Sequence, residues 1–259
     1  MTVRISIITP VLNKFFFISK CIENVISQGT DNIEQIIIDG NSTDGTKEII
    51  ENYVTKYDHI RFISETDKGQ SDAMNRGIRL AKGEILGILN ADDFYSQGTL
   101  NSVKIKFTSL TAPTIIFAKC NVIEENGEKI KTYNPRNISL SKILGTKEFP
   151  PNPSSYFYHK SLHEIVGLYD SDNHYSMDLE FLLKVIKMNI PIKTVNEVWG
   201  NFRLIKGTKT YKNMRSKEGV NEFNKIISRY LHQQPFQQKL IISYYNLISK
   251  SRYYLSRII

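Results

Sequence analysis

The chain has 259 residues, of which 41% are hydrophobic and 23% are charged. This composition is that of a folded globular protein rather than a disordered one, and the length fits one large α/β domain with or without an appendage. No run approaches the roughly 18 apolar residues of a membrane span. Cys21 and Cys120 lie far apart in the sequence, which argues against a disulfide framework or a cysteine zinc site.

The net charge of +8 is unevenly distributed along the chain. Residues 1–200 carry a net charge of −2, whereas residues 201–259 carry +10. A basic end on a near-neutral body suits an anionic partner such as a membrane surface, and a solvated basic face is the structural alternative. The first residues, MTVRISIITPVLNK, show no charged leader with a long apolar core and a cleavage site, so we expect a cytoplasmic protein.

The first 90 residues alternate β-branched apolar runs with helical patterns. The predicted strands cover residues 3–10, 34–40, 60–64 and 84–90. The predicted helices cover residues 13–27, a segment capped by Ser42, Thr43 or Asp44, and residues 71–83 with Gly83 at the end. Strands that alternate with helices predict an α/β fold, with a Rossmann-like, mainly parallel sheet and helices on both faces.

The pattern changes after Asp93. Residues 114–133 predict a β-hairpin that turns at Asn126-Gly127. The elements expected beyond it are a proline-rich loop and aromatic strand at 149–160, an amphipathic helix at 176–190, short strands at 192–195 and 198–204, and helices at 212–230 and 236–259.

Polar residues follow the predicted strands of the first half. Because ligands of such sheets bind beyond the carboxyl ends of the strands, we expect Pro10, Asp39, residues 64–67 and residues 90–93 to converge in one cleft. Asp39 is placed to accept a hydrogen bond from a nucleoside, and a turn aspartate is the structural alternative. Residues 65–77 precede a helix start whose backbone donors suit a diphosphate, although many surface loops share this composition.

Two adjacent carboxylates, Asp92 and Asp93, end the fourth predicted strand. Like charges side by side repel, and burial makes the repulsion costlier. A divalent cation, Mg²⁺ or Mn²⁺, would remove the repulsion because it prefers oxygen ligands. A helix cap is the structural alternative, but a cap needs only one acid. The pair therefore predicts a divalent metal site and leaves open which carboxylate is the main ligand.

Four segments carry a resemblance to a known family. They are SIITPVLNK, IIIDGNSTDGT, DKGQSDAMNRGIRLAKGEILGILNADD and YSMDLEFLLKV. Together they resemble the family 2 glycosyltransferases of GT-A fold over residues 3–203, especially the bacterial enzymes that build O-antigen, capsule and exopolysaccharide chains. The resemblance implies that residues 1–95 bind a nucleotide sugar and residues 96–205 bind the acceptor within one domain, followed by a basic helical extension at 206–259.

The resemblance also implies roles for individual residues. Thr9 and Pro10 would lie against the nucleobase, with Asp39 bonding to its edge. The residues that would flank the nucleotide are Asp67, Gly69 and Asn75. Asp92 and Asp93 would bind ribose or the metal, and Asp178 would be the catalytic base. The sequence departs from the family pattern at Met177, where a Glu commonly precedes the base, and at Ile205, near where many relatives carry a His.

The reaction implied is the inverting transfer of a sugar from a nucleotide diphosphate sugar, usually a UDP-sugar, to a saccharide acceptor that is lipid-linked. Asp178 would remove the acceptor proton, and the metal would offset charge on the leaving diphosphate. A sugar nucleotidyltransferase is one alternative, but TPVLNKFFF lacks the Gly- and Arg-rich phosphate loop of that class. A nucleotide-sugar-binding protein without turnover is the other.

The last predicted helix, residues 236–259, is basic and amphipathic. Lys239, Lys250 and Arg257 recur on one side, and Leu240 and Tyr244 lie on another. This pattern is typical of a segment that lies on a membrane surface, and a helix packed on the catalytic domain is the equally weighted alternative. Nucleic acid is not expected as a partner, because the sequence shows no base-reading motif.

Overall fold

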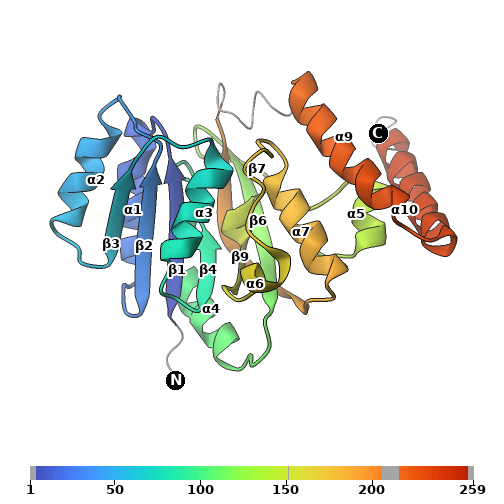
Figure 1. Ribbon diagram of the computed structural model, residues 1–259, viewed down its shortest axis with the longest axis horizontal. Helices are drawn as coiled ribbons and strands as arrows, with labels where there is room; N and C mark the ends of the chain where they lie inside the picture. Colours follow the sequence, from blue (N-terminus) through green and yellow to red (C-terminus); the bar gives the residue numbers. More distant parts are fainter. Residues whose placement is uncertain (1–3, 151, 206–215, 256–259) are drawn as a thin grey trace.

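One mixed sheet runs through the protein in the computed structural model, which describes residues 4–150, 152–205 and 216–255 (Figure 1). Its strands are β1 (Ile5–Val11), β2 (Ile33–Asp39), β3 (Ile60–Ser64), β4 (Ile85–Ile88), β5 (Phe94–Tyr95), β6 (Ile115–Glu124), β7 (Lys129–Tyr133), β8 (Tyr156–His159) and β9 (Ile192–Leu204). The strand order is β3-β2-β1-β4-β8-β6-β9-β5, and β7 pairs with β6.

The two halves of the sheet differ in strand direction. Strands β1 to β4 are parallel, which confirms the prediction for the first half. Strand β8 is antiparallel to both β4 and β6, β9 is parallel to β6, and β5 is antiparallel to β9. The result is the mixed α/β sheet expected of a GT-A type fold.

Helices cover both faces of this sheet. They are α1 (Phe15–Ser27), α2 (Thr46–Val54), α3 (Gln70–Leu80), α4 (Thr99–Thr108), α5 (Leu140–Thr146), α6 (Leu162–Val166), α7 (Met177–Lys187), α9 (Lys217–His232) and α10 (Phe236–Leu255). The two faces follow from strand geometry, because successive side chains of a strand point to opposite sides. Ile8 and Ile36 pack toward α3 and α7, whereas Ile7 and Ile85 pack toward α1 and α4.

Several predicted elements differ from the observed ones at their ends. Helix α3 ends at Leu80 instead of Gly83, and Gly83 instead allows a close approach to β1, where an added Cβ would lie 2.6 Å from the Ser6 nitrogen. The two short strands predicted near the end of the domain form one strand, β9. The predicted hairpin is confirmed as β6 and β7, with Gly127 at a φ of +93° in the turn.

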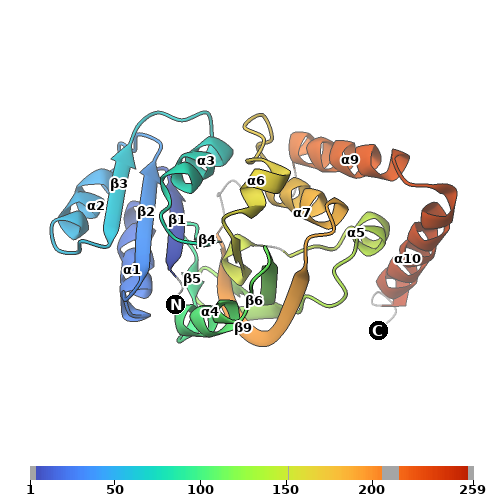
Figure 2. The same cartoon turned by 60° about the horizontal axis from the view of Figure 1, so that its bottom comes forward.

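The C-terminal helices pack on the domain. Helix α10 lies against α5, where an added Cβ on Gly145 would come within 2.6 Å of the Ile242 carbonyl oxygen. Helix α9 is joined to α7, and the two C-terminal helices form one end of the molecule (Figure 2). Among the described helices, none has the length and apolar content needed to cross a membrane. The predicted helical residues 212–215 and 256–259 lie outside the described residues.

Candidate active site

The ends of the first three strands bring predicted site residues together. Thr9 and Pro10 are buried in β1, and the Thr9 hydroxyl is hydrogen bonded within the sheet. Asp39 is the last residue of β2 and is fully buried. Its carboxylate accepts hydrogen bonds from the Ser42 backbone nitrogen at 3.0 Å and from the Ser64 hydroxyl, at the end of β3, at 2.6 Å. These donors fix the orientation of Asp39 at the carboxyl edge of the sheet.

The loop that enters α3 lies beside Asp39. An added Cβ on Gly40 would lie 2.7 Å from Oδ2 of Asp67, so the glycine makes room for this carboxylate next to the end of β2. Asp67 Oδ1 accepts from the Gly69 nitrogen at 2.9 Å, and burial raises the pKa of Asp67. Gly69 has a φ of +126° as the residue before α3. The structure therefore brings Asp67 and Gly69 to the same edge as Asp39.

Asn75 is buried on α3, and both its amide nitrogen and its amide oxygen form hydrogen bonds to backbone atoms. It donates to the Tyr169 carbonyl oxygen at 2.8 Å and accepts from the Tyr169 nitrogen at 3.0 Å. These contacts join α3 to the segment before α7. They give Asn75 a structural task that the sequence did not reveal, because Tyr169 is 94 residues away.

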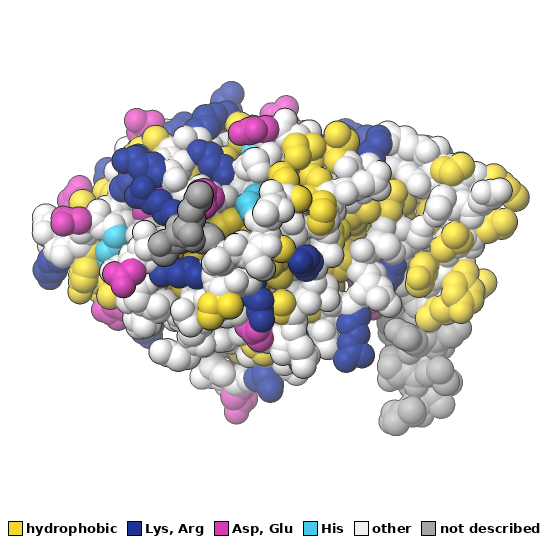
Figure 3. Space-filling model, turned by 90° about the horizontal axis from the view of Figure 1, so that it is seen from below, with side chains coloured by type: hydrophobic (Ala, Val, Ile, Leu, Met, Phe, Trp, Pro, Cys, Tyr) yellow, Lys and Arg dark blue, Asp and Glu magenta, His cyan; other side chains and the backbone are white. Residues whose placement is uncertain are grey.

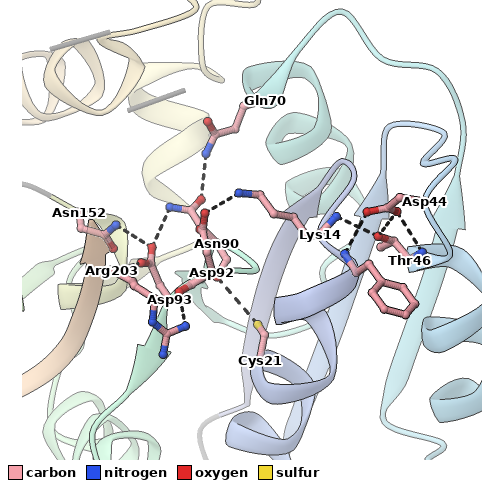
Figure 4. Close-up of polar contacts among 11 residues, drawn as sticks. Lys14, Cys21, Asp44, Thr46, Gln70, Asn90, Asp92, Asp93, Asn152 and Arg203 are labelled. Carbon is pink, nitrogen blue, oxygen red and sulfur yellow. Dashed lines mark hydrogen bonds and ion pairs between the residues drawn. The ribbon is translucent and has the colours of Figure 1, made fainter. Parts of the chain in front are cut away.

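Asp93 is held at the end of β4 by donors from three segments (Figure 4). Its side chain is buried, with an exposed fraction of 2%. Oδ2 accepts from Asn90 at 3.1 Å and from Asn152 at 2.7 Å, and Oδ1 accepts from the Arg203 backbone nitrogen at 3.0 Å. Burial, with a contribution from the Asp92 charge, raises the pKa of Asp93 to about 7. Both oxygens of Asp93 are thus committed to protein donors.

Asp92 has different surroundings from its neighbour. Its side chain is 16% exposed, and Oδ2 forms an ion pair with Lys14 Nζ at 2.5 Å. Arg203 donates from its guanidinium to the Asp92 carbonyl oxygen at 3.0 Å. Lys14 stands immediately before α1, and its backbone nitrogen donates to Thr46. The ammonium therefore offsets the Asp92 charge, a contact across 78 residues that the sequence did not indicate (Figure 4).

The fit of a divalent cation can be judged from these donors. In the described part of the chain, no group of three or more His, Cys, Asp or Glu side chains could hold a metal ion. Magnesium sites that act on nucleotides use one or two carboxylates together with substrate phosphates. Asp92, with its partly exposed carboxylate, meets that requirement if the Lys14 ammonium moves off it. Asp93 serves less well, because both of its oxygens already accept hydrogen bonds.

Asp178 lies in the first turn of α7, among aromatic side chains. The Tyr156 hydroxyl donates to its Oδ1 at 3.1 Å. Tyr158 and Tyr169 belong to the same cluster, and both rings contact Phe181 in tilted arrangements, with ring centroids 5.0 and 5.1 Å away. Burial raises the pKa of Asp178 to about 6, and the Tyr156 hydrogen bond opposes part of that rise. A carboxylate with a pKa near neutrality is suited to general base chemistry.

The proline-rich segment contacts two of these carboxylates, Asp93 and Asp178. Asn152, at the start of a short 3₁₀ helix (Pro153–Ser155), donates to Asp93. Four residues later, Tyr156 donates to Asp178. The sequence placed this segment on the acceptor side without singling out either residue. The connection could not be found from spacing, because Asn152 and Asp93 are 59 residues apart.

The fold and the acids at its carboxyl edge define a GT-A type protein. The family described as glycosyl transferase family 2 matches residues 6–162. The chain belongs to this family.

Curated relatives are bacterial glycosyltransferases. The chain is 26% identical over 210 residues to an uncharacterized glycosyltransferase, EpsJ, of Bacillus subtilis, with 74% of this chain and 59% of that protein covered. It is 26% identical over 207 residues to chondroitin synthase of Escherichia coli, covering 80% of this chain and 29% of that protein. A Campylobacter jejuni protein, GalNAc(5)-diNAcBac-PP-undecaprenol beta-1,3-glucosyltransferase, is 28% identical over 148 residues, covering 56% and 47%. The chain thus spans only part of the length of these relatives.

Solved structures share the fold at low sequence identity. S. aureus TarS 1-349 in complex with UDP-GlcNAc aligns with a TM-score of 0.69 at 18% identity, covering 94% of this chain and 71% of that one. The mannosyltransferase PcManGT from Pyrobaculum calidifontis, in complex with GDP-Man and Mn²⁺, aligns with a TM-score of 0.61 at 18% identity, covering 97% and 76%.

Proposed function

We propose that the protein is an inverting glycosyltransferase that moves a sugar from a UDP-sugar to a saccharide acceptor during synthesis of a bacterial surface polysaccharide such as O-antigen or capsule. The observation that carries this proposal is Asp178, a carboxylate with a pKa of about 6 held by the Tyr156 hydroxyl. Family membership and relatives that include chondroitin synthase support the same reaction class.

The donor would bind to the first half of the domain, residues 1–95. In this proposal Thr9, Pro10 and Asp39 contact the nucleobase, and the loop with Asp67 and Gly69 flanks the nucleotide together with α3, which carries Asn75. Neighbouring structures hold UDP-GlcNAc in one case and GDP-Man in the other, which supports a nucleotide sugar as the donor. The acceptor would bind to the second half, residues 96–205.

Asp92 would hold the divalent cation, Mn²⁺ or Mg²⁺, together with the donor diphosphate. The carboxylate of Asp92 is the more accessible of the pair, and the related fold of PcManGT was solved with Mn²⁺. When bound, the cation supplies positive charge that stabilises the leaving diphosphate. Asp93, which the sequence also proposed as a ligand, would act by holding the turn that presents Asp92.

Asp178 would act on the acceptor. Its carboxylate removes the proton of the acceptor hydroxyl, whose oxygen forms a bond to the anomeric carbon. The bond from that carbon to the diphosphate oxygen breaks on the opposite face, so the anomeric configuration inverts. The aromatic surroundings that raise the pKa of Asp178 keep a basic carboxylate next to the reacting hydroxyl.

The acceptor in this proposal is lipid-linked. The protein would be cytoplasmic, with α10 on the inner face of the cell membrane. Exposed apolar side chains form one stripe along α10: Phe236 (75% exposed), Leu240 (57%), Tyr244 (61%) and Leu247 (65%). Hydrophobic side chains gather at this end of the molecule (Figure 3). Helix α10 has three Lys or Arg and no acidic residue. An apolar stripe with positive charge suits an anionic bilayer, and the Campylobacter relative is named for an undecaprenol-linked substrate.

Sedimentation with vesicles tests this docking. We expect wild-type protein to co-sediment with anionic vesicles and Leu240→Ser/Leu247→Ser to remain in solution. Ile105→Ser, which removes another exposed apolar side chain on α4, is the control. Equal binding by all three proteins would contradict the docking.

A screen of nucleotide sugars tests the proposed activity. We expect one UDP-sugar to raise the melting temperature in the presence of Mn²⁺ and to be hydrolysed slowly without acceptor. Binding without hydrolysis or transfer would favour the binding-protein alternative. Formation of UDP-sugar from UTP and a sugar phosphate would favour the nucleotidyltransferase.

A further inference from the structure

Helix α7 begins without a cap of its own. Its N-cap residue, Ser176, makes no side-chain capping hydrogen bond. Glu222 of α9 instead binds the turn that leads into the helix. Its carboxylate accepts from the backbone nitrogens of His174 at 3.1 Å, Tyr175 at 2.8 Å and Ser176 at 2.8 Å. A second helix therefore holds the turn that precedes α7.

A buried carboxylate gives α9 a second hold on the same turn. Glu180, on the first turn of α7, has an exposed fraction of 6% and forms an ion pair with Arg229 of α9. Its other oxygen accepts from Asn173 at 3.1 Å. Asn173 in turn accepts from the Ser176 nitrogen at 2.9 Å. Charged residues of α7 and α9 thus fix the turn on both sides of Ser176.

The turn held by α9 links the two sides of the site. Asp178 follows Ser176 by two residues. In the other direction, the Asn173 carbonyl oxygen accepts from the Ser71 hydroxyl of α3 at 2.8 Å. The His174 ring lies against the loop that precedes α3, where an added Cβ on Gly69 would be 3.2 Å from Nδ1. The turn consequently lies between α9 and the loop assigned to the nucleotide.

We propose that Glu222 is a positioning residue for the reaction: by accepting three backbone hydrogen bonds, it fixes the turn that leads into α7 and thereby the approach of Asp178 to the acceptor hydroxyl. This inference rests on the proposed function, in which Asp178 is the base. Hydrogen bonds to an ionised acceptor are shorter and stronger than neutral ones. Because a misplacement of about 1 Å can lower a rate by about 100-fold, losing them should reduce turnover.

The docking of α9 does not depend on Glu222. Three apolar side chains of α9, Ile226, Ile227 and Tyr230, are each 5% exposed and belong to the same core cluster as α7. These contacts lie beyond Glu222 along the helix, so they should keep α9 in place when the carboxylate is removed. The effect of changing Glu222 should therefore be local to the turn.

Kinetics of Glu222 variants test the inference, with Glu218→Ala as the matched control. Glu218 is an exposed acid of the same helix, so its loss changes the charge equally. For Glu222→Ala we expect kcat to fall by about 10- to 100-fold, with the donor KM and the Kd for UDP within a factor of two of wild type. Glu222→Gln should be intermediate, because its amide oxygen can still accept from Tyr175 and Ser176 while its NH₂ group faces His174.

Several results would overturn this role for Glu222. A kcat for Glu222→Ala equal to that of Glu218→Ala would do so, as would equal losses of kcat and of UDP-binding capacity. If Glu222→Ala does not fold, a wild-type kcat from Glu222→Gln overturns the role. Asp178→Asn, assayed in parallel, separates the two proposals. Full turnover by that variant contradicts the proposed function, whereas loss of turnover there with an unaffected Glu222→Ala contradicts only the positioning role.

Discussion

The proposed donor and acceptor sides of the site are built in different ways. On the donor side, Asp39 is held by Ser42, three residues later, and by Ser64 on the adjacent strand. On the acceptor side, Asp178 is held by Tyr156 from β8, and the turn before its helix is held by Glu222 from α9. The position of Asp39 therefore follows from β2, the loop after it and the adjacent strand. The acceptor side depends on segments brought together only by the complete fold.

Removing the carboxylate of Asp178 should have the largest effect on turnover and should leave donor binding unchanged. For Asp178→Asn we expect turnover to fall by about 10²- to 10⁴-fold, because the amide cannot accept the proton. UDP affinity, measured by calorimetry, should stay unchanged because the hydrogen-bond partner of Asp178, Tyr156, is not among the residues assigned to the nucleotide. A parallel loss of UDP affinity would show that the two sides are coupled.

The adjacent acids Asp92 and Asp93 should differ in how much they contribute to stability. Asp93→Ala should lower the free energy of unfolding by about 2–4 kcal/mol, because Asn90, Asn152 and the Arg203 nitrogen lose their acceptor. Asp92→Ala removes only a partly exposed ion pair and should change stability by less than about 1 kcal/mol.

The effect of Mn²⁺ on UDP binding should rank the two acids in the opposite order, with the larger loss at Asp92. Asp92→Ala should abolish the increase in UDP affinity that Mn²⁺ provides, whereas folded Asp93→Asn should keep part of it. Urea unfolding measures the stabilities, and UDP titrations with and without Mn²⁺ measure the metal effect. Equal stability losses for the two alanine variants would contradict the division of roles.

The pH dependence of kcat should report on Asp178. The base acts only when deprotonated, and burial raises its pKa to about 6. Activity should therefore be low below that pH and should rise as the pH increases through it. Tyr156→Phe removes the hydrogen bond that opposes the rise in the pKa of Asp178. In this variant, the rise of kcat with pH should therefore occur at higher pH than in the wild type. If kcat of this variant rises at the same pH as in the wild type, a group other than Asp178 controls the pH dependence.

The smallest effect is expected at Lys14. Lys14→Met removes the ammonium that pairs with Asp92, so a divalent cation no longer competes with it. The Mn²⁺ concentration that half-saturates the UDP complex should fall by about threefold to tenfold, the scale of a partly exposed ion pair. Lys20→Met, an exposed lysine of α1, serves as the control. A higher Mn²⁺ requirement in Lys14→Met would contradict this competition.

Sequence patterns predicted the first half of the fold well because its signals are local. The four β-branched runs, the glycines after them and the acids at their ends lie within a few residues of each other, and the structure confirms the parallel strands they predicted. The hairpin at Asn126-Gly127 was predictable for the same reason, since the turn residues themselves select the geometry.

The second half was less predictable because its polar residues are satisfied by distant partners. The two predicted short strands stop before Asn196 and resume after Glu197, yet β9 continues through both residues. Glu197 accepts from Trp199 on the same strand and pairs with Lys106 of α4. In the same way, the partners of Glu222 are 46 to 48 residues away, and within the first half Lys14 pairs with Asp92 across 78 residues. No local pattern encodes such contacts.

The Lys14–Asp92 ion pair has a consequence for the order in which substrates enter. Without donor, the Asp92 charge is already balanced by a side chain of the same protein. A free divalent cation must displace that ammonium and gains little from a single carboxylate, whereas a cation that arrives with a diphosphate brings its own phosphate ligands. In the proposed reaction, the site would therefore favour a cation that binds together with the nucleotide sugar over a free cation, and the Lys14–Asp92 ion pair would form again when the nucleoside diphosphate leaves.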